Sequence, residues 1–315
     1  MKIFVAGATG VLGRRLVRQF TERGHSVAGL VRSDEGAERV RRAGGVPVRA
    51  DLFDAEALAR AAEGAEVVIH AATSIPISPR GAKKAWAMND RIRREGTRAL
   101  TAAAAKVGAR VYLQQSVVWV MRPPHDAPYT EATTPDPAPV LLSAVEGEAI
   151  AREAGERHGF AVGVLRCGMF YAADTGHTRM MAQELMKGRL PIIGRGENIA
   201  APLHVDDAAS AFVAAAEAGR AGIWHVIDME PLPMGRLIRA FAEMLGAPPP
   251  RRVPVWLARL LAGKAAVDTM TASMRTTNAA FVRDVGWKPR YPTYREGLAE
   301  VIRSWREEGF LGGRR

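Results

Sequence analysis

A glycine-rich turn near the start of the chain restricts its fold more than any other feature. Gly7, Gly10 and Gly13 follow the apolar run Lys2–Ala6 and open the helical pattern Leu12–Arg23. Gly7 permits a tight turn, Gly10 lets the backbone approach a pyrophosphate, and Gly13 lets the helix pack close to the strand. The helix N-terminus then offers free N–H groups and a positive dipole end to phosphate. We therefore expect a dinucleotide-binding turn with contacts from Gly7, Thr9, Gly10, Val11, Leu12 and Gly13.

Short β-branched runs alternate with alanine-rich helical patterns over residues 1–230, as in a parallel sheet covered by helices. The pattern predicts an α/β fold, a doubly wound parallel Rossmann sheet of about seven strands. The expected strands are Lys2–Ala6, Ser26–Val31, Pro47–Ala50, Glu66–Ala71, Arg110–Ser116, Ala161–Arg166 and Gly222–Ile227. Helical patterns between them include Leu12–Arg23, Ala55–Ala62, Ala85–Val107 and Ser143–Gly159.

Two segments interrupt this alternation. Prolines at positions 123, 124, 128, 135 and 137 precede Pro139 and exclude a helix or a central strand, so we expect a surface loop. After Asp228, helical patterns separated by Pro248–Pro250 replace the strands. We expect a Rossmann domain over 1–170, completed by 204–228, and a smaller, mostly helical C-terminal substrate-binding lobe over 171–203 and 229–315.

Charge and composition limit the kinds of molecule that the chain is expected to bind. The net charge is +11, yet no aromatic platform or nucleic-acid-binding motif accompanies the basic residues, so we expect no nucleic-acid partner. No run approaches the ~18 apolar residues of a membrane span, and we expect no membrane partner but a small-molecule substrate. The single cysteine, Cys167, excludes an intrachain disulfide and suits a cytoplasmic location. The spacing of the seven histidines predicts no metal site.

The spacing G-x-x-G-x-x-G and four later segments resemble the extended short-chain dehydrogenase/reductase family, of the NAD(P)-dependent epimerase/dehydratase type. The segments are Asp51-Leu52, His70-Ala71-Ala72, Leu165-Arg166-Cys167-Gly168-Met169-Phe170-Tyr171 and Leu203-His204-Val205-Asp206-Asp207-Ala208. The match runs in order from residue 1 to about 305. The resemblance implies a homodimer formed through Ala85–Val107 and Ser143–Gly159. It also implies cofactor contacts from Asp51, Leu52, Ala71, Ala72 and Cys167.

The residues after the second expected strand bear on which nicotinamide cofactor binds. An NAD-preferring site places Asp or Glu there to bind the ribose 2′-OH, but this chain has Arg32 and Ser33. A guanidinium pairs well with a 2′-phosphate, Ser33 adds a donor, and Arg14 and Arg15 lie near enough to contribute. Asp34 is the opposing feature. We expect NADP (NADPH), with NAD as the less favoured cofactor.

The catalytic pair of this family, Tyr-x-x-x-Lys, is missing. None of the five tyrosines has a lysine four residues on. Alignment on Glu148 and on Leu165-Arg166 puts the family's Tyr at Val140 and its Lys at Ala144. Neither side chain can transfer a proton, and a general acid contributes roughly 10²–10⁴-fold in rate.

Three other residues are candidates for parts of the site. Ser116 matches the family's Ser/Thr that orients a substrate carbonyl, and the alternative is a strand-end serine satisfied by backbone. Tyr171 is a candidate replacement acid, with a structural role as the alternative. His204 is expected to brace the loop before a helix that Asp206 or Asp207 caps.

Without the Tyr, either another group supplies the proton, or the substrate needs none, or there is no turnover. Three hypotheses stay open. One is an NADP(H)-binding oxidoreductase acting on a small carbonyl or alcohol metabolite with a non-standard proton donor. The others are a catalytically inactive cofactor-binding sensor or scaffold, and an epimerase or dehydratase that retains its cofactor. The substrate cleft is expected at the carboxyl ends of the strands, with walls from Trp119, Met121, Met169–Tyr171 and Trp256.

Overall fold

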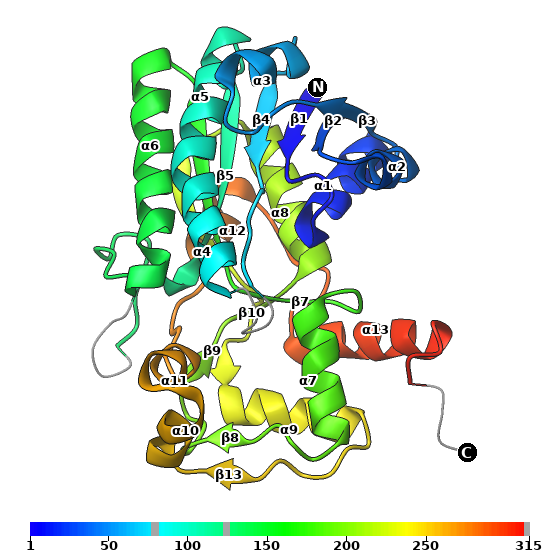
Figure 1. The fold of residues 1–315 in the computed structure, drawn as a ribbon, viewed down its shortest axis with the longest axis vertical. Helices are drawn as coiled ribbons and strands as arrows, with labels where there is room; N and C mark the ends of the chain where they lie inside the picture. The colour runs from blue at the N-terminus through cyan, green and yellow to red at the C-terminus, as the bar shows by residue number, and fades with distance from the viewer. Residues whose placement is uncertain (77–81, 122–126, 312–315) are drawn as a thin grey trace.

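A seven-stranded parallel sheet forms the centre of the structure (Figure 1). The structure is a computed structural model that describes residues 1–76, 82–121 and 127–311. The strand order is β11-β6-β5-β4-β1-β2-β3, and every neighbouring pair is parallel. This confirms the predicted doubly wound Rossmann sheet, and each predicted strand end lies within one residue of the observed end. The strands are β1 (Lys2–Ala6), β2 (Ser26–Val31), β3 (Val46–Arg49), β4 (Val67–His70), β5 (Val111–Val117), β6 (Ala161–Cys167) and β11 (Gly222–Val226).

Helices cover both faces of the sheet because successive side chains of a strand point to opposite faces. Ile3 of β1 shares a core with α1 and α8, whereas its neighbour Phe4 shares a core with α3, α5 and α6. The first face also carries α2. The helices are α1 (Val11–Glu22), α2 (Asp34–Arg42), α3 (Ala55–Ala61), α5 (Thr97–Lys106), α6 (Leu142–His158) and α8 (Val205–Ala218).

The helix predicted over Ala85–Val107 is interrupted. α4 (Ala82–Arg91) continues through a π-helical turn, η1 (Ile92–Gly96), into α5. Such turns are rare and often occur at functional sites. Here the turn brings the Ile92 carbonyl within 3.3 Å of Nε2 of His70, at the end of β4. The homodimer implied for this helix and α6 stays a prediction.

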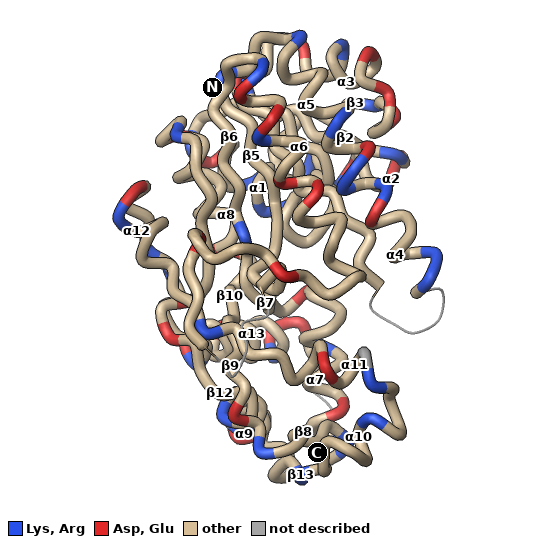
Figure 2. The backbone as a smooth tube through the Cα atoms, turned by 90° about the vertical axis from the view of Figure 1, so that its left-hand side faces the viewer, with Lys and Arg blue, Asp and Glu red and all other residues tan. Residues whose placement is uncertain are grey.

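A mostly helical C-terminal part lies beyond the carboxyl edge of the sheet, as both the front and the side view show (Figure 1, Figure 2). Its core contains Phe241, Leu298 and Trp305. α12 (Ala279–Val285) instead packs on the sheet, since Phe281 belongs to the core on the α1 and α8 face. The division into domains stays a prediction.

The remaining helices are α7 (Gly176–Met186), α9 (Met234–Met244), α10 (Val255–Ala262), α11 (Lys264–Met270) and α13 (Tyr294–Glu307). Short strands pair as β7 (Met169–Tyr171) with β10 (Pro202–His204), β8 (Ile192–Ile193) with β13 (Arg252–Val253), and β9 (Ile199–Ala200) with β12 (Leu232–Pro233).

The proline-rich segment has no regular structure over its described residues 127–138, as expected, while Pro123 and Pro124 lie outside the described residues. Two short 3-10 turns, η2 (Val118–Val120) and η4 (Pro139–Leu141), flank it, and the second leads into α6. In the described parts of the chain, no helix has the length and apolar character needed to cross a bilayer.

Two buried histidines lie in the sheet. Burial of His70 lowers its pKa to about 4, because a charged imidazole would lose its hydration there. Burial together with the nearby positive charge of Arg166 lowers the pKa of His225 to about 3. Both imidazoles are therefore neutral in the folded protein at neutral pH.

These two histidines predict an acid-dependent stability. Their folded pKa values lie below the unfolded value of about 6.5, so the unfolded state binds more protons and stability is lost as the pH falls from about 6.5 toward 4. Replacing His70 with asparagine should lower the slope of the unfolding free energy against pH by up to about 1.4 kcal/mol per pH unit. Urea denaturation between pH 7 and 4.5 measures this slope. The control is His158→Asn, since His158 is exposed. Equal slopes for both variants would contradict the assignment.

Candidate functional site

A cavity of about 770 Å³ lies at the carboxyl ends of the strands where the strand order reverses, between β1 and β4. Most of the residues that the sequence predicts to contact the cofactor line this cavity. Those that line it are Gly7, Thr9, Gly10, Val11, Leu12, Arg32, Asp51, Leu52, Ala71 and Ala72. Residues that the sequence reasoning missed also line it, among them Arg49, Thr73, Ser74, Ile92 and Gln115.

The glycine turn is shaped to take a dinucleotide. Gly7 has φ +88°, and a Cβ there would lie 2.5 Å from the Ala72 nitrogen. Gly10 is the N-cap of α1 and has no side chain to satisfy the first-turn amides. These amides therefore stay available to an anion at the positive end of the helix. The open backbone, the helix end and the adjacent small residues fit the pyrophosphate part of a nicotinamide dinucleotide.

Three of the predicted cofactor residues lie outside the cavity lining, for physical reasons. Gly13 packs α1 on the turn, where a Cβ would lie 2.0 Å from the Gly7 carbonyl oxygen. Ser33 is the N-cap of α2, and its hydroxyl accepts a hydrogen bond from Gly36 N at 3.1 Å. Cys167 is fully buried at the end of β6, and burial raises the pKa of its thiol. Their contacts with the cofactor stay predictions.

The arginines near the cavity differ in their partners. Arg32 is exposed, lines the cavity and has no hydrogen bond or ion pair within the described part of the chain. Arg14 donates to Asp174 at 2.8 Å, and Arg15 bonds both Asp174 at 2.9 Å and Asp206 at 2.6 Å. Neither Arg14 nor Arg15 lines the cavity, and both pair with carboxylates on other elements, so their contribution to a 2′-phosphate site stays a prediction that this placement does not support.

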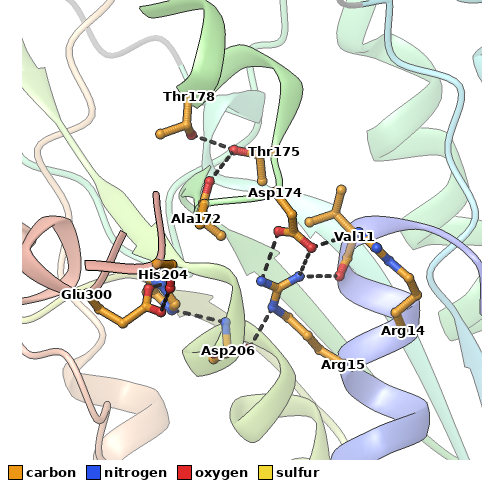
Figure 3. A network of polar contacts seen from close by, with 12 residues as sticks. Val11, Arg14, Arg15, Ala172, Asp174, Thr175, Thr178, His204, Asp206 and Glu300 are labelled. Atoms are coloured by element: carbon orange, nitrogen blue, oxygen red, sulfur yellow. Dashed lines mark hydrogen bonds and ion pairs between the residues drawn. The ribbon is translucent and has the colours of Figure 1, made fainter. Parts of the chain in front are cut away.

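Figure 3 shows the network that these arginines enter. Arg15 of α1 also donates to the Val11 carbonyl, so it joins the glycine turn to the start of α7 through Asp174 and to α8 through Asp206. His204 extends the chain of contacts, since its Nδ1 accepts from Asp206 N and its Nε2 lies 3.2 Å from Glu300 of α13.

His204 itself is the N-cap of α8, which begins at Val205. The expectation that Asp206 or Asp207 caps this helix was wrong, because the N-cap lies two or three residues earlier in the chain. Asp207 instead accepts hydrogen bonds from the backbone of Arg290 and Tyr291 at 2.6 and 2.9 Å. An imidazole nitrogen can cap a helix as an acceptor, although the sequence preference is for Ser, Thr, Asp and Asn.

Ser116 lies in a buried polar cluster between the sheet and α6. Its hydroxyl donates to Glu148 at 2.5 Å, and Arg166 donates to the same carboxylate at 2.6 Å. All three residues are at most 2% exposed. Because side chains alternate along β5, the cavity is lined by the preceding residue, Gln115, and not by Ser116. A catalytic role for Ser116 stays a prediction that this placement does not support.

Tyr171 is also turned away from the cavity, while its neighbour Phe170 lines it. The Tyr171 hydroxyl donates to the buried Asp228 at 2.9 Å, and a Cβ on Gly297 would lie 2.1 Å from that oxygen. Burial raises the pKa of both Tyr171 and Asp228. The tyrosine is held as a structural donor, so its proposed role as replacement acid gains no support.

The positions that correspond to the missing catalytic pair form an apolar wall. Ala144 packs in one hydrophobic cluster with Val117, Val120 and Met121, and Trp119 packs against it. Val140 lies in η4, next to Leu141, which packs against this cluster. Tyr129 belongs to the same cluster, but its hydroxyl donates to the Val118 carbonyl at 3.1 Å and burial raises its pKa, so it is held as a structural donor. Among the described residues, no group of three or more His, Cys, Asp or Glu is placed to bind a metal ion.

The glycine turn predicts a selective loss of binding. Gly7→Ala should abolish nicotinamide dinucleotide binding, with an affinity loss of more than about 100-fold, because its Cβ would meet the Ala71–Ala72 backbone. Gly24→Ala is a matched control, since Gly24 has φ +79° but a Cβ there has no neighbour within 4 Å. The control should lose about 1–2 kcal/mol of stability and keep its affinity. Calorimetric titration measures the affinity of each variant for the cofactor, and urea denaturation measures its stability. Equal cofactor affinities of Gly7→Ala and Gly24→Ala would contradict the role of Gly7.

Comparison with known proteins places the chain in a family. Residues 3–226 match the family model described as NAD dependent epimerase/dehydratase family. The chain is 37% identical over 309 residues to the 3-diazoavenalumate denitrifying reductase of a Streptomyces species, covering 95% of this chain and 99% of that protein. It is 30% identical over 269 residues to the 2-alkyl-3-oxoalkanoate reductase of Stenotrophomonas maltophilia, covering 79% and 77% of the two chains.

A solved structure shares the fold. The dTDP-glucose 4,6-dehydratase of Streptomyces venezuelae, with NAD bound, superposes with a TM-score of 0.79 at 22% identity and covers 98% of each chain. The resemblance to extended short-chain dehydrogenase/reductases is thereby confirmed, together with a fold that binds a nicotinamide dinucleotide. Because the family model matches more than half of its length, the chain belongs to the NAD dependent epimerase/dehydratase family.

Proposed function

We propose that the protein is an NADPH-dependent reductase whose substrate loses a nitrogen group as dinitrogen, as an aromatic diazonium compound does. The observation that carries this proposal is that two apolar residues, Val140 and Ala144, stand where the family places its proton-transferring residues, and that Ala144 packs in a hydrophobic cluster with Val117. The resemblance to a denitrifying reductase that acts on a diazo compound supports it independently.

The chain's own residues suit the cofactor. The turn from Gly7 to Leu12 would hold the pyrophosphate, Asp51 the adenosine and the unpaired Arg32 a 2′-phosphate. When bound, the reduced nicotinamide supplies a hydride. Asp34, which argued for NAD, has one carboxylate oxygen bonded to Arg49 at 2.5 Å, so its negative charge is partly offset at the edge of the cavity.

The chemistry explains why this wall needs no acid. In the net reaction the carbon of an aromatic diazonium ion gains a hydride, its C–N bond breaks, and the bonding pair leaves with dinitrogen. No proton is consumed. A ketone would instead become an alkoxide that requires protonation, which without a general acid proceeds roughly 10²–10⁴-fold more slowly. The wall thus disfavours carbonyl reduction and leaves dinitrogen release unimpaired.

The lining also suits a flat aromatic substrate. Phe170 lines the cavity and offers an aromatic ring to a flat substrate, whereas Trp119 packs on the apolar wall and lies outside the lining. Gln115 contributes an amide, whose nitrogen donates to the Ser116 carbonyl at 3.3 Å. An amide hydrogen-bonds a substrate but does not donate a proton to it at neutral pH. The apolar side chains also exclude water, which would otherwise compete for a reactive cation.

Substrate comparison tests the proposal. The protein with NADPH should reduce an aromatic diazonium compound to the arene, with dinitrogen released and deuterium from 4-deuterated NADPH found at the carbon that lost nitrogen. The matched aromatic ketone should react at least about 100-fold more slowly. Heat-denatured protein controls for the uncatalysed reaction. Faster turnover of the ketone would contradict the proposal and favour a carbonyl reductase. Cofactor binding without turnover would favour a sensor, and a cofactor that cannot be exchanged would favour an epimerase.

The cofactor preference has its own test. Arg32→Asp places a carboxylate where a 2′-phosphate would bind, so NADPH affinity should fall by about 100-fold while NADH affinity is kept or improved. Fluorescence titration of both cofactors measures this. Arg41→Asp is the matched control, since Arg41 is an exposed residue of α2 that does not line the cavity. Equal losses for NADPH and NADH would refute the assignment of Arg32.

A further inference from the structure

Three charged side chains meet where β2 and β3 end. The two strands pair with Val31 opposite Arg49, which places Arg32 and Arg49 on adjacent strands at the same edge. Both arginines line the cavity next to Asp51. Asp34 opens α2, and its Oδ1 accepts a hydrogen bond from Nη2 of Arg49 at 2.5 Å.

The bond between Arg49 and Asp34 is readily exchanged. The Asp34 side chain is fully exposed and that of Arg49 is 59% exposed, so water screens the pair. Exposed ion pairs of this kind contribute little to stability. Arg32, in contrast, has no carboxylate partner among the described residues. At the edge of the cavity, Arg32 is thus unpaired among the described residues, and Arg49 is paired only weakly, with Asp34.

We infer that Arg49 and Asp34 together set the cofactor preference, and that a 2′-phosphate competes with Asp34 for the Arg49 guanidinium. The inference rests on the NADPH preference proposed above. Without a cofactor, Arg49 neutralises the carboxylate that would otherwise accept from the 2′-OH of NADH. With NADPH, the guanidinium passes from Asp34 to the phosphate, so a single side chain both disfavours one cofactor and binds the other.

Charge decides the exchange in favour of the phosphate. A phosphomonoester carries about −1.5 to −2 charges near pH 7, more than the single charge of a carboxylate, and offers three acceptor oxygens. A guanidinium binds such a group in the bidentate manner that a lysine cannot. Arg14 and Arg15 are not placed for this role, because neither lines the cavity.

Two variants separate the parts of Arg49's role. Arg49→Gln removes the cation and frees Asp34, so it should weaken NADPH binding by about tenfold and leave NADH binding equal or stronger. Asp34→Asn releases Arg49 from its anion, so it should strengthen NADPH binding by a few-fold. Arg39→Gln is the matched control, because Arg39 pairs with Glu35 on the same helix and does not line the cavity.

The measurement is a calorimetric titration with NADPH, NADH, 2′,5′-ADP and 5′-AMP. The two adenosine phosphates isolate the 2′-phosphate from the nicotinamide end. The ratio of the 5′-AMP to the 2′,5′-ADP dissociation constant should fall about tenfold in Arg49→Gln and stay within about twofold in Arg39→Gln. Equal ratios in these two variants, or weaker 2′,5′-ADP binding in Asp34→Asn, overturn the inference. A wild-type protein that binds NADH as tightly as NADPH overturns the cofactor assignment of the proposed function instead, and does so before any variant is made.

Discussion

The contact of α1 with the glycine turn is the constraint on which the site depends. Gly13 lies so close to the Gly7 carbonyl that no other residue fits, and this contact sets the distance between the first helix and β1. Because β1 lies beside β4 at the reversal of strand order, the position of the turn also determines where the cavity opens. The small residues Ala71 and Ala72 at the end of β4 complete the same opening.

A second constraint comes from the buried carboxylate of Glu148. Ser116 and Arg166 bond it from neighbouring strands, so α6 is attached to the sheet through charge as well as through apolar packing. A buried ion pair of this kind is expensive to break, because removing one partner leaves an uncompensated charge and costs about 3–5 kcal/mol. The cluster thus fixes the position of α6 on β5 and β6, independently of the residues at its N-terminal end.

Much of the fold could be predicted from the sequence, because strand and helix patterns depend on local periodicity. The strands were placed to within a residue, and the glycine turn located the cavity. What a pattern does not contain is the direction of a single side chain. Gln115 and Ser116 are adjacent in β5, and only the pairing of the strands shows which one faces the cavity.

Partners distant in sequence were beyond prediction for the same reason. Arg15 and Arg32 look equally able to bind a phosphate in the sequence, and they differ because Asp174 and Asp206 reach Arg15 from residues far along the chain. The capping role of His204 was missed because its bond to Asp206 runs against residue preferences. Residue type indicated the chemistry of the site, whereas long-range contacts determined which residues are free to carry it out.

The network around Arg15 has a consequence for any substitution at that position. Arg15 is only 13% exposed in its side chain and bonds carboxylates of two other segments, Asp174 just before α7 and Asp206 of α8. Removing its guanidinium would leave both carboxylates with fewer positive partners beside the turn that lines the cavity. A single side chain of the first helix thus couples two segments that lie far along the sequence.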